Sequence, residues 1–69
     1  MTTDKDIMSL ILIILENDGS FKGVKFDEIK DKLSHENISD NKLLLLIKEL
    51  MKEGLIYEPT LNYYVFIGS

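Results

Sequence analysis

The chain has 69 residues, a formal net charge of −4, and 45% hydrophobic and 29% charged residues. A chain of this length and composition holds one compact globular domain with one core, and we expect that domain to cover residues 1–69. The absence of cysteine excludes a disulfide framework and a thiolate metal site. The longest apolar run, Leu10–Leu15, is far shorter than the roughly 20 residues that span a bilayer. We therefore expect an intracellular protein, in the cytoplasm, the nucleus or the nucleoid.

The basic residues are of one kind: all eight are lysine, and none is arginine. Arginine is the usual bidentate reader of guanine and the usual planar clamp on phosphate, so its absence disfavours sequence-specific reading of DNA. Lysine still contacts phosphate non-specifically where charge gathers on one face. The base composition of the genome explains the lysine usage equally well.

The first element is predicted as a helix over residues 4–17. Thr3 and Asp6 have the spacing of a capping box, and Gly19 follows as a stop signal. Its apolar side chains go all the way round the helix: Ile7, Met8, Leu10, Ile11, Leu12, Ile13, Ile14 and Leu15. A helix that is apolar on all sides needs packing partners on more than one side.

The middle of the chain is punctuated by glycine and then becomes helical. Val24 and Phe26 have the alternation of a short strand. A short helix is predicted over residues 27–34, with acidic residues in its first turn. Asn37 follows it and is expected to adopt a left-handed turn conformation there.

A third helix is predicted over residues 40–53, capped by Ser39 or Asp40 and closed by Gly54. Its core stripe consists of Leu43, Leu46, Ile47 and Leu50. The opposite face mixes lysine with leucine and carries Asn41, Leu45, Lys48 and Lys52, with Leu44 and Met51 on one flank.

From Leu55 the apolar period changes from 3.6 to 2, which predicts a β-hairpin over residues 55–67. Pro59 has no backbone N–H to donate, so we assign it to the turn Pro59–Asn62 and not to the strand ladder.

This element order predicts an α+β fold, a winged helix with three helices and a small antiparallel hairpin as the wing. A three-helix bundle with a disordered tail is the alternative, and the apolar, β-prone run Tyr63–Ile67 disfavours it. The expected core consists of Ile7, Leu10, Ile11, Ile14, Phe26, Ile29, Leu33, Leu43, Ile47, Leu50, Ile56 and Val65.

The segment ISDNKLLLLIKELMKEGLIYEP, residues 38–59, resembles the C-terminal winged helix of the archaeal and eukaryotic minichromosome maintenance (MCM) replicative helicases. Those domains run a helix of the pattern LLxxLxxEGxIYEP into the wing, and GVKFDEIKDKL extends the resemblance upstream. A second, weaker resemblance is to the C-terminal winged helix of the middle subunit of replication protein A, which recruits other proteins.

The chain departs from the helicase pattern after Pro59. Similar helicase domains have a glycine and a basic finish there, whereas this chain has Thr60, Leu61 and Asn62, and then the uncharged YYVFIGS. A wing without lysine or arginine has no basic side chain to contact a phosphate backbone.

Catalytic signals are weak in this sequence. There is no glycine-rich loop ending in GK[ST], so the helicase motor is absent. His35, the only histidine, is interpreted as a surface residue at a helix end. The acidic residues Asp27, Glu28 and Asp31 are interpreted as the solvated first turn of a helix. We expect no enzyme activity, no cofactor and no metal.

Two functions remain open. The resemblance implies a regulatory module that contacts a partner protein or the remainder of a helicase chain and binds DNA at most weakly. Its candidate contacts are Leu44, Leu45, Met51 and Leu61, while Leu12 and Ile13, with Met8, are candidates for a homodimer through the first helix. The alternative is a small winged-helix transcription regulator, monomeric or dimeric, that contacts duplex DNA through Asn41, Lys42, Lys48, Lys52 and Lys25.

Both sets of candidates also have an ordinary structural interpretation. Leu44 and Met51 can pack under the wing or the first helix. The lysines of the third helix can be solvated and paired locally with Glu49 and Glu53.

Overall fold

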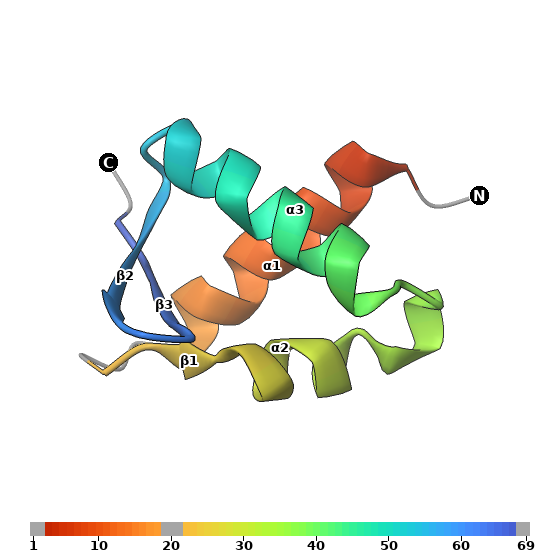
Figure 1. Cartoon of the computed structure of the whole chain (residues 1–69), viewed down its shortest axis with the longest axis horizontal. Helices are drawn as coiled ribbons and strands as arrows, with labels where there is room; N and C mark the ends of the chain where they lie inside the picture. Colours follow the sequence, from red (N-terminus) through yellow and green to blue (C-terminus); the bar gives the residue numbers. More distant parts are fainter. Residues whose placement is uncertain (1–2, 19–21, 68–69) are drawn as a thin grey trace.

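The structure is a computed structural model that describes residues 3–18 and 22–67. In these ranges the elements follow in the order α1 (Asp4–Asp18), β1 (Val24–Lys25), α2 (Phe26–Lys32), the short 3-10 helix η1 (Ser34–Glu36), α3 (Asp40–Lys52), β2 (Ile56–Thr60) and β3 (Tyr63–Phe66). The helices gather on one side of a small antiparallel sheet (Figure 1). The predicted α+β arrangement of helices and hairpin is confirmed.

The capping box at the start of α1 forms as predicted. The backbone N–H of Thr3 donates to Asp6 Oδ2 at 3.2 Å, and the N–H of Asp6 donates to Thr3 Oγ1 at 3.2 Å. These two bonds satisfy N–H groups that the first turn of a helix leaves without a partner. The predicted stop at Gly19 lies outside the described residues.

Helix α2 begins at Phe26, earlier than predicted, and ends at Lys32, two residues before the predicted end. The chain continues as η1 and turns at Asn37, whose φ of 55° and ψ of 45° are the predicted left-handed conformation. An ion pair of 3.1 Å between Lys30 Nζ and Asp40 Oδ1 links α2 to the start of α3. The turn at Asn37 and this ion pair together position the start of α3 next to α2.

Helix α3 is capped by Ser39, whose Oγ accepts a hydrogen bond of 3.1 Å from the N–H of Lys42. It ends at Lys52, and Gly54 follows with a φ of 77°. The predicted core stripe is buried at each of its positions, Leu43, Leu46, Ile47 and Leu50.

The sheet of the described residues has the strand order β1-β3-β2. β1 pairs with β3 through Val24 opposite Tyr64 and Lys25 opposite Tyr63. Gly23 makes this pairing possible, because its φ is 89° and a Cβ there would lie 2.6 Å from the carbonyl oxygen of Tyr64. The strand that Val24 predicted therefore becomes a third strand beside the hairpin.

Pro59 was assigned to the turn, and that assignment is wrong: it lies within β2. Tyr57 pairs with Val65 and Thr60 with Tyr63, so β2 has one extra residue between these pairs and bulges at Pro59. β2 is also an edge strand. Proline, which has no backbone N–H, is tolerated in edge strands and at bulges.

The hairpin turn itself is formed by residues 61–62. Asn62 has a φ of 69°, and its N–H donates to a carboxylate oxygen of Glu58 at 2.7 Å. Its carbonyl accepts from the N–H of Phe26 at 2.8 Å. The tip of the wing is thus fastened to the start of α2 and does not project freely (Figure 1).

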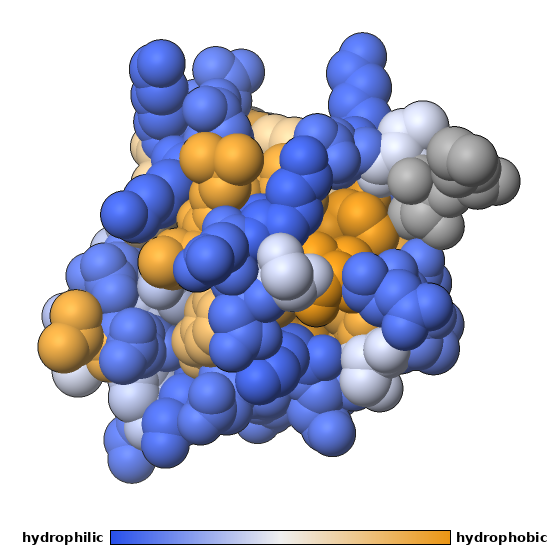
Figure 2. Space-filling model, turned by 45° about the vertical axis from the view of Figure 1, so that its right-hand side comes forward, coloured by the Kyte–Doolittle hydropathy of each residue, from blue (hydrophilic) through white to orange (hydrophobic). Residues whose placement is uncertain are grey.

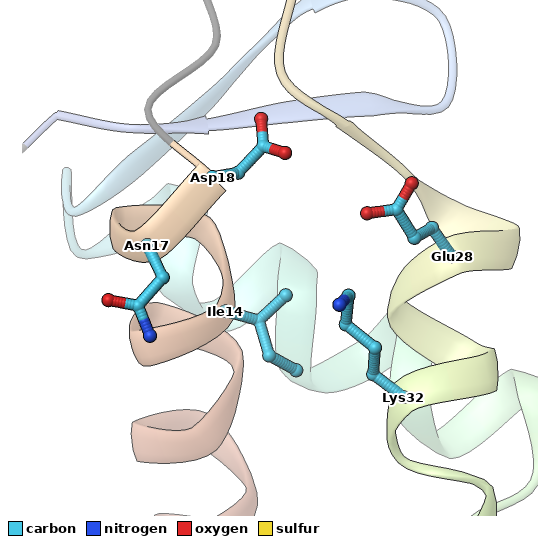
Figure 3. Close-up of a pocket in the computed structure, with 5 residues that line it drawn as sticks. All are labelled: Ile14, Asn17, Asp18, Glu28 and Lys32. Carbon is cyan, nitrogen blue, oxygen red and sulfur yellow. The ribbon is translucent and has the colours of Figure 1, made fainter.

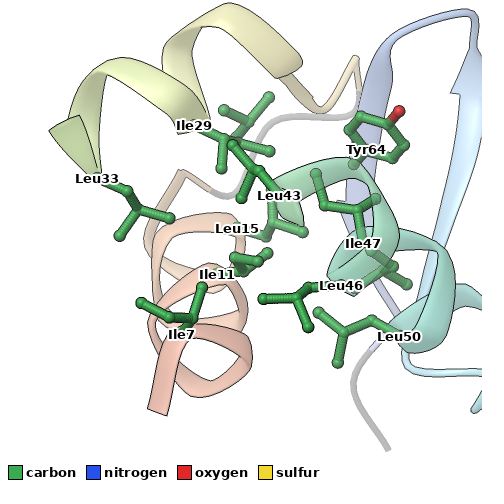
Figure 4. Packing of buried hydrophobic residues seen from close by; sticks show 12 residues of the cluster. Ile7, Ile11, Leu15, Ile29, Leu33, Leu43, Leu46, Ile47, Leu50 and Tyr64 are labelled. Carbon is green, nitrogen blue, oxygen red and sulfur yellow. The ribbon is translucent and has the colours of Figure 1, made fainter. Parts of the chain in front are cut away.

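The core lies between α1, α2, α3 and the inner face of the sheet (Figure 4). Its buried members are Ile7, Ile11, Leu15, Val24, Ile29, Leu33, Leu43, Leu46, Ile47, Leu50, Ile56 and Tyr64. Three predicted members, Leu10, Ile14 and Phe26, are only partly buried and pack against this cluster.

The prediction of Val65 as the inward residue of the last strand is wrong. Tyr64 points toward the helices instead and is 2% exposed, and Val65 is partly buried on the other face. Successive strand residues alternate between faces, so a shift of one residue exchanges the two sets of side chains. The apolar character of every residue in Tyr63–Ile67 left the sequence without a polar position to mark the outer face.

Candidate functional site

The outer face of α3 carries four exposed side chains in one line, which we call the outer stripe: Asn41, Leu45, Lys48 and Lys52. Their spacing of four, three and four residues keeps them on one side of the helix, opposite the buried stripe. Leu45, in the middle, is 53% exposed. The structure thus brings together three of the predicted DNA contacts and one predicted protein contact.

The lysines near this stripe differ in their partners. Lys48 and Lys52 are exposed and make no ion pair within residues 3–18 and 22–67. Of the alternative structural interpretation, their solvation therefore holds and their pairing with Glu49 and Glu53 does not. By contrast, Lys42 Nζ lies 2.9 Å from Asp4 Oδ2 and joins α3 to the start of α1. Lys48 and Lys52 therefore remain available to a partner, whereas Lys42 is already engaged.

The wing contributes no basic residue to this surface, because residues 55–67 contain no lysine or arginine. Lys25, the remaining predicted DNA contact, comes from β1, where it is exposed opposite Tyr63. Leu61, at the wing tip, is 77% exposed. The tip is held at the start of α2 by the hydrogen bond from the N–H of Phe26 to the carbonyl of Asn62, and this end of the hairpin lies away from the middle of α3 (Figure 1). Leu61 and Leu45 are accordingly on different parts of the surface.

The other predicted protein contacts are divided between surface and core. Met51 and Leu12 are partly buried and pack against the core cluster, and Leu44 is partly buried. Ile13 is exposed on α1, as the proposed homodimer requires. A role for any of these side chains in a contact stays a prediction.

Sequence reasoning missed an apolar outer face on the sheet. Leu55, Tyr57 and Ile67 are exposed there. The signal was present, since Tyr63–Ile67 is apolar at every position, but without the strand register it could not be assigned to a face.

Glu58, in the Tyr-Glu-Pro segment that carries the family resemblance, organises the wing. Its carboxylate accepts the N–H of Asn62. Burial of the Tyr64 ring, the negative charge of Glu58 and a hydrogen bond to its side chain raise the pKa of Tyr64 above the ordinary 10.0. Glu58 thus stabilises the hairpin turn at residues 61–62.

Titratable side chains line two hollows of the surface. One, of about 350 Å³, lies between α1 and α2 and is lined by Ile14, Asn17, Asp18, Glu28 and Lys32 (Figure 3). It holds carboxylates and a lysine but no hydroxyl or thiol nucleophile beside a base. Among residues 3–18 and 22–67, no group of three or more His, Cys, Asp or Glu side chains is placed to hold a metal ion.

The second hollow, of about 340 Å³, lies between the starts of α1 and α3 and includes Ile7, Ile38 and Leu46 in its lining. On this side of the molecule, apolar surface is visible between polar side chains (Figure 2). The ion pair of Lys42 with Asp4 comes from two further lining residues. No helix in the described part of the chain is long and apolar enough to cross a membrane.

The fold is that of a winged helix-turn-helix domain. Helix α3 carries the exposed stripe, and the hairpin of β2 and β3 is hydrogen-bonded to the start of α2. The family model of the MCM protein C-terminal winged helix-turn-helix domain matches residues 3–67, and the chain belongs to this family. The family is one of small non-catalytic modules in the setting of DNA replication. Comparisons with curated proteins and with solved structures found no match.

Proposed function

We propose that this domain is a regulatory module of an MCM helicase chain that acts through protein contacts and binds DNA at most weakly. The observation that carries the proposal is the composition of the outer stripe, in which an exposed leucine, Leu45, occupies the centre of the helix face that reads DNA in winged-helix proteins. An exposed apolar side chain at the centre of a contact surface is typical of a protein interface. A partner protein or the remainder of the helicase chain is the expected occupant, in an intracellular setting.

Electrostatics supports weak DNA binding. The outer stripe offers two lysines, Lys48 and Lys52, that have no ion-pair partner among the described residues, and the wing has no lysine. Two phosphate contacts give a slope of log K against log[salt] of about −2, against −5 or steeper for proteins with six or more contacts. The net charge of −4 adds repulsion from the phosphate backbone.

The transcription-regulator alternative rests on the same two lysines, because they lie exposed on the helix that would enter the major groove. It requires tighter binding, and, if dimeric, a two-fold contact such as one through Leu12 and Ile13. Both requirements are measurable.

The test is fluorescence anisotropy of a short labelled DNA duplex, titrated with the chain at several salt concentrations. We expect binding that weakens about tenfold between about 50 and about 200 mM salt, and a loss of that binding in the double variant Lys48→Glu, Lys52→Glu. The matched control, Lys5→Glu with Lys32→Glu, changes the net charge equally but away from the stripe. Nanomolar affinity at moderate salt would favour the regulator.

A further inference from the structure

The sheet has an exposed face opposite the core, which we call the outer sheet face. Strand alternation and register place Leu55, Tyr57, Tyr63, Val65 and Ile67 on it, with the polar Thr60 and Lys25 beside Tyr63 at one end. Lys25 lies opposite Tyr63, Tyr57 lies opposite Val65, and the N–H of Ile67 donates to the carbonyl of Leu55 at 2.9 Å. The face therefore grades from a cation, through two tyrosines, to aliphatic side chains.

This face is apolar although it is open. Tyr57 is 47% exposed and Ile67 is 52% exposed. An antiparallel strand with one face in water normally alternates apolar with polar residues, and a strand that is apolar at every position is typical of a sheet covered on both sides. Residues 63–67 are apolar throughout, so the sequence of β3 is that of a strand with a cover on its outer face as well.

The strands of the sheet carry few acidic residues, and Lys25 is exposed at one end of this face. The chain has 12 acidic residues, yet Glu58 is the only one in the strands of the described residues, and its carboxylate is used by Asn62 and Tyr64. Lys25 is exposed and has no ion-pair partner within residues 3–18 and 22–67. A ligand that covers the aliphatic and tyrosine rows thus meets an uncompensated cation at one end.

We propose that the outer sheet face docks an amphipathic helix of a partner protein that carries a carboxylate at the end facing Lys25. The inference rests on the proposed function, a module that acts through protein contacts, and adds a second contact face to the outer stripe of α3. A helix is the fitting element because the exposed surface is a face, and helices pack on sheet faces whereas added strands pair with sheet edges.

The dimensions define the partner's pattern. The rows from Tyr63 in β3 to Ile67 just after it are four residue steps apart, about 14 Å at the usual strand rise. A helix covers that length in about nine residues, so apolar side chains at positions i, i+4 and i+7 would meet the three rows, with the carboxylate about one turn beyond.

A second copy of this chain is a poorer occupant. Two-fold pairing through this face would set one carboxylate-free surface against another and leave both Lys25 ammonium groups without a counter-charge. Complementary charge is what directs and orients a protein contact.

The experiment is a backbone amide NMR titration of the isotope-labelled chain with two synthetic helical peptides. Both have leucine at i, i+4 and i+7 in an alanine-based helix, and they differ only in glutamate or lysine at i+11. We expect shifts at Tyr57, Val65 and Ile67, an affinity about two- to fivefold higher for the glutamate peptide, and a reversed preference in Lys25→Glu.

Two variants complete the test. Ile67→Asp should lower the affinity for either peptide at least tenfold, whereas Lys5→Gln, a control on α1 with the same change of −1 in charge, should leave it unchanged. Shifts confined to the outer stripe, or none with either peptide, would overturn this docking face. Shifts at Tyr57 and Tyr63 with an oligothymidine strand alone would overturn it in favour of single-stranded nucleic acid. Tight duplex binding through Lys48 and Lys52 would instead overturn the proposed function.

Discussion

The two faces of α3 differ in composition and in burial. The inner face consists of aliphatic side chains that are buried between α1 and the sheet, Leu43, Leu46, Ile47 and Leu50. The outer stripe places Leu45 among Asn41, Lys48 and Lys52, all exposed. Packing determines which residues fit the inner face, whereas nothing in the fold requires a leucine outside. Packing thus accounts for the buried leucines, whereas a contact of the exposed Leu45 with a partner belongs to the proposed function.

The same contrast recurs on β3. Tyr64 points inward, is buried, and interacts with Glu58. Its neighbour Tyr63 and the exposed Tyr57 of β2 lie on the outer sheet face. One residue type thus serves the core in one place and the surface in another, so residue type alone does not separate structure from function.

The largest effect that tests this contrast is expected from truncation inside α3. Ile47→Ala should lower the free energy of unfolding by about 2 to 5 kcal/mol, because Ile47 is fully buried and the substitution leaves a cavity. Leu45→Ala should change it by less than about 0.5 kcal/mol. Urea unfolding followed by circular dichroism measures both. If Ile47→Ala does not fold, Ile47→Val should still cost about 1 kcal/mol; equal losses at positions 45 and 47 would contradict the contrast.

Tyr64→Phe should lower the free energy of unfolding at neutral pH by about 1.5 kcal/mol, because it removes the hydrogen bond to the charged Glu58. The raised pKa also predicts a pH dependence. The folded state holds the Tyr64 proton more tightly than the unfolded chain, so this contribution is complete below pH 10.0 and is lost as the pH rises through the folded pKa.

The measurement for Tyr64 is urea unfolding from pH 8 to pH 11. The wild-type chain should lose more stability above about pH 10 than Tyr64→Phe does, since the variant lacks the titrating group and the other side chains are common to both. Parallel pH profiles for the two chains would show that Tyr64 does not carry the dependence.

A smaller effect is expected at the start of α3. Ser39→Ala should cost about 1 kcal/mol, because the Ser39 side chain accepts the N–H of Lys42. Ser34→Ala is the matched control, since η1 has no side-chain cap and Ser34 is exposed. Thermal unfolding of both variants gives the difference, and a cost for Ser34→Ala as large as for Ser39→Ala would argue against the cap.

The smallest effect on stability is expected at the lysines of the outer stripe. Lys48→Glu and Lys52→Glu should each change the free energy of unfolding by less than about 0.5 kcal/mol, because neither lysine has an ion-pair partner in the part of the chain that the structure describes. Chemical denaturation checks this. A loss above 1 kcal/mol from either substitution would show that the outer stripe supports the fold.

Much of the helical framework could be predicted from the sequence. The capping box of Thr3 and Asp6, the Ser39 cap and the left-handed Asn37 are local, because each depends on residues a few positions apart. The buried stripe of α3 follows equally from helical periodicity.

The sheet was predicted less well, because its details depend on pairing between distant residues. The bulge at Pro59 and the inward position of Tyr64 are set by the register of β2 and β3. For the candidate site, helical spacing placed Lys48 and Lys52 on one exposed face. Two facts required the structure: neither lysine has an ion-pair partner in the described part of the chain, and Lys42 pairs with Asp4.

The most direct test of the central claim is a backbone amide NMR titration of the labelled chain with a short DNA duplex, at low and then at moderate salt. We predict small shifts at Lys48 and Lys52 at low salt that disappear at moderate salt, with no shifts in the wing, because two lysines make few phosphate contacts. Large, saturable shifts at Asn41, Leu45, Lys48 and Lys52 that persist at moderate salt would contradict the account and identify α3 as a DNA-reading helix.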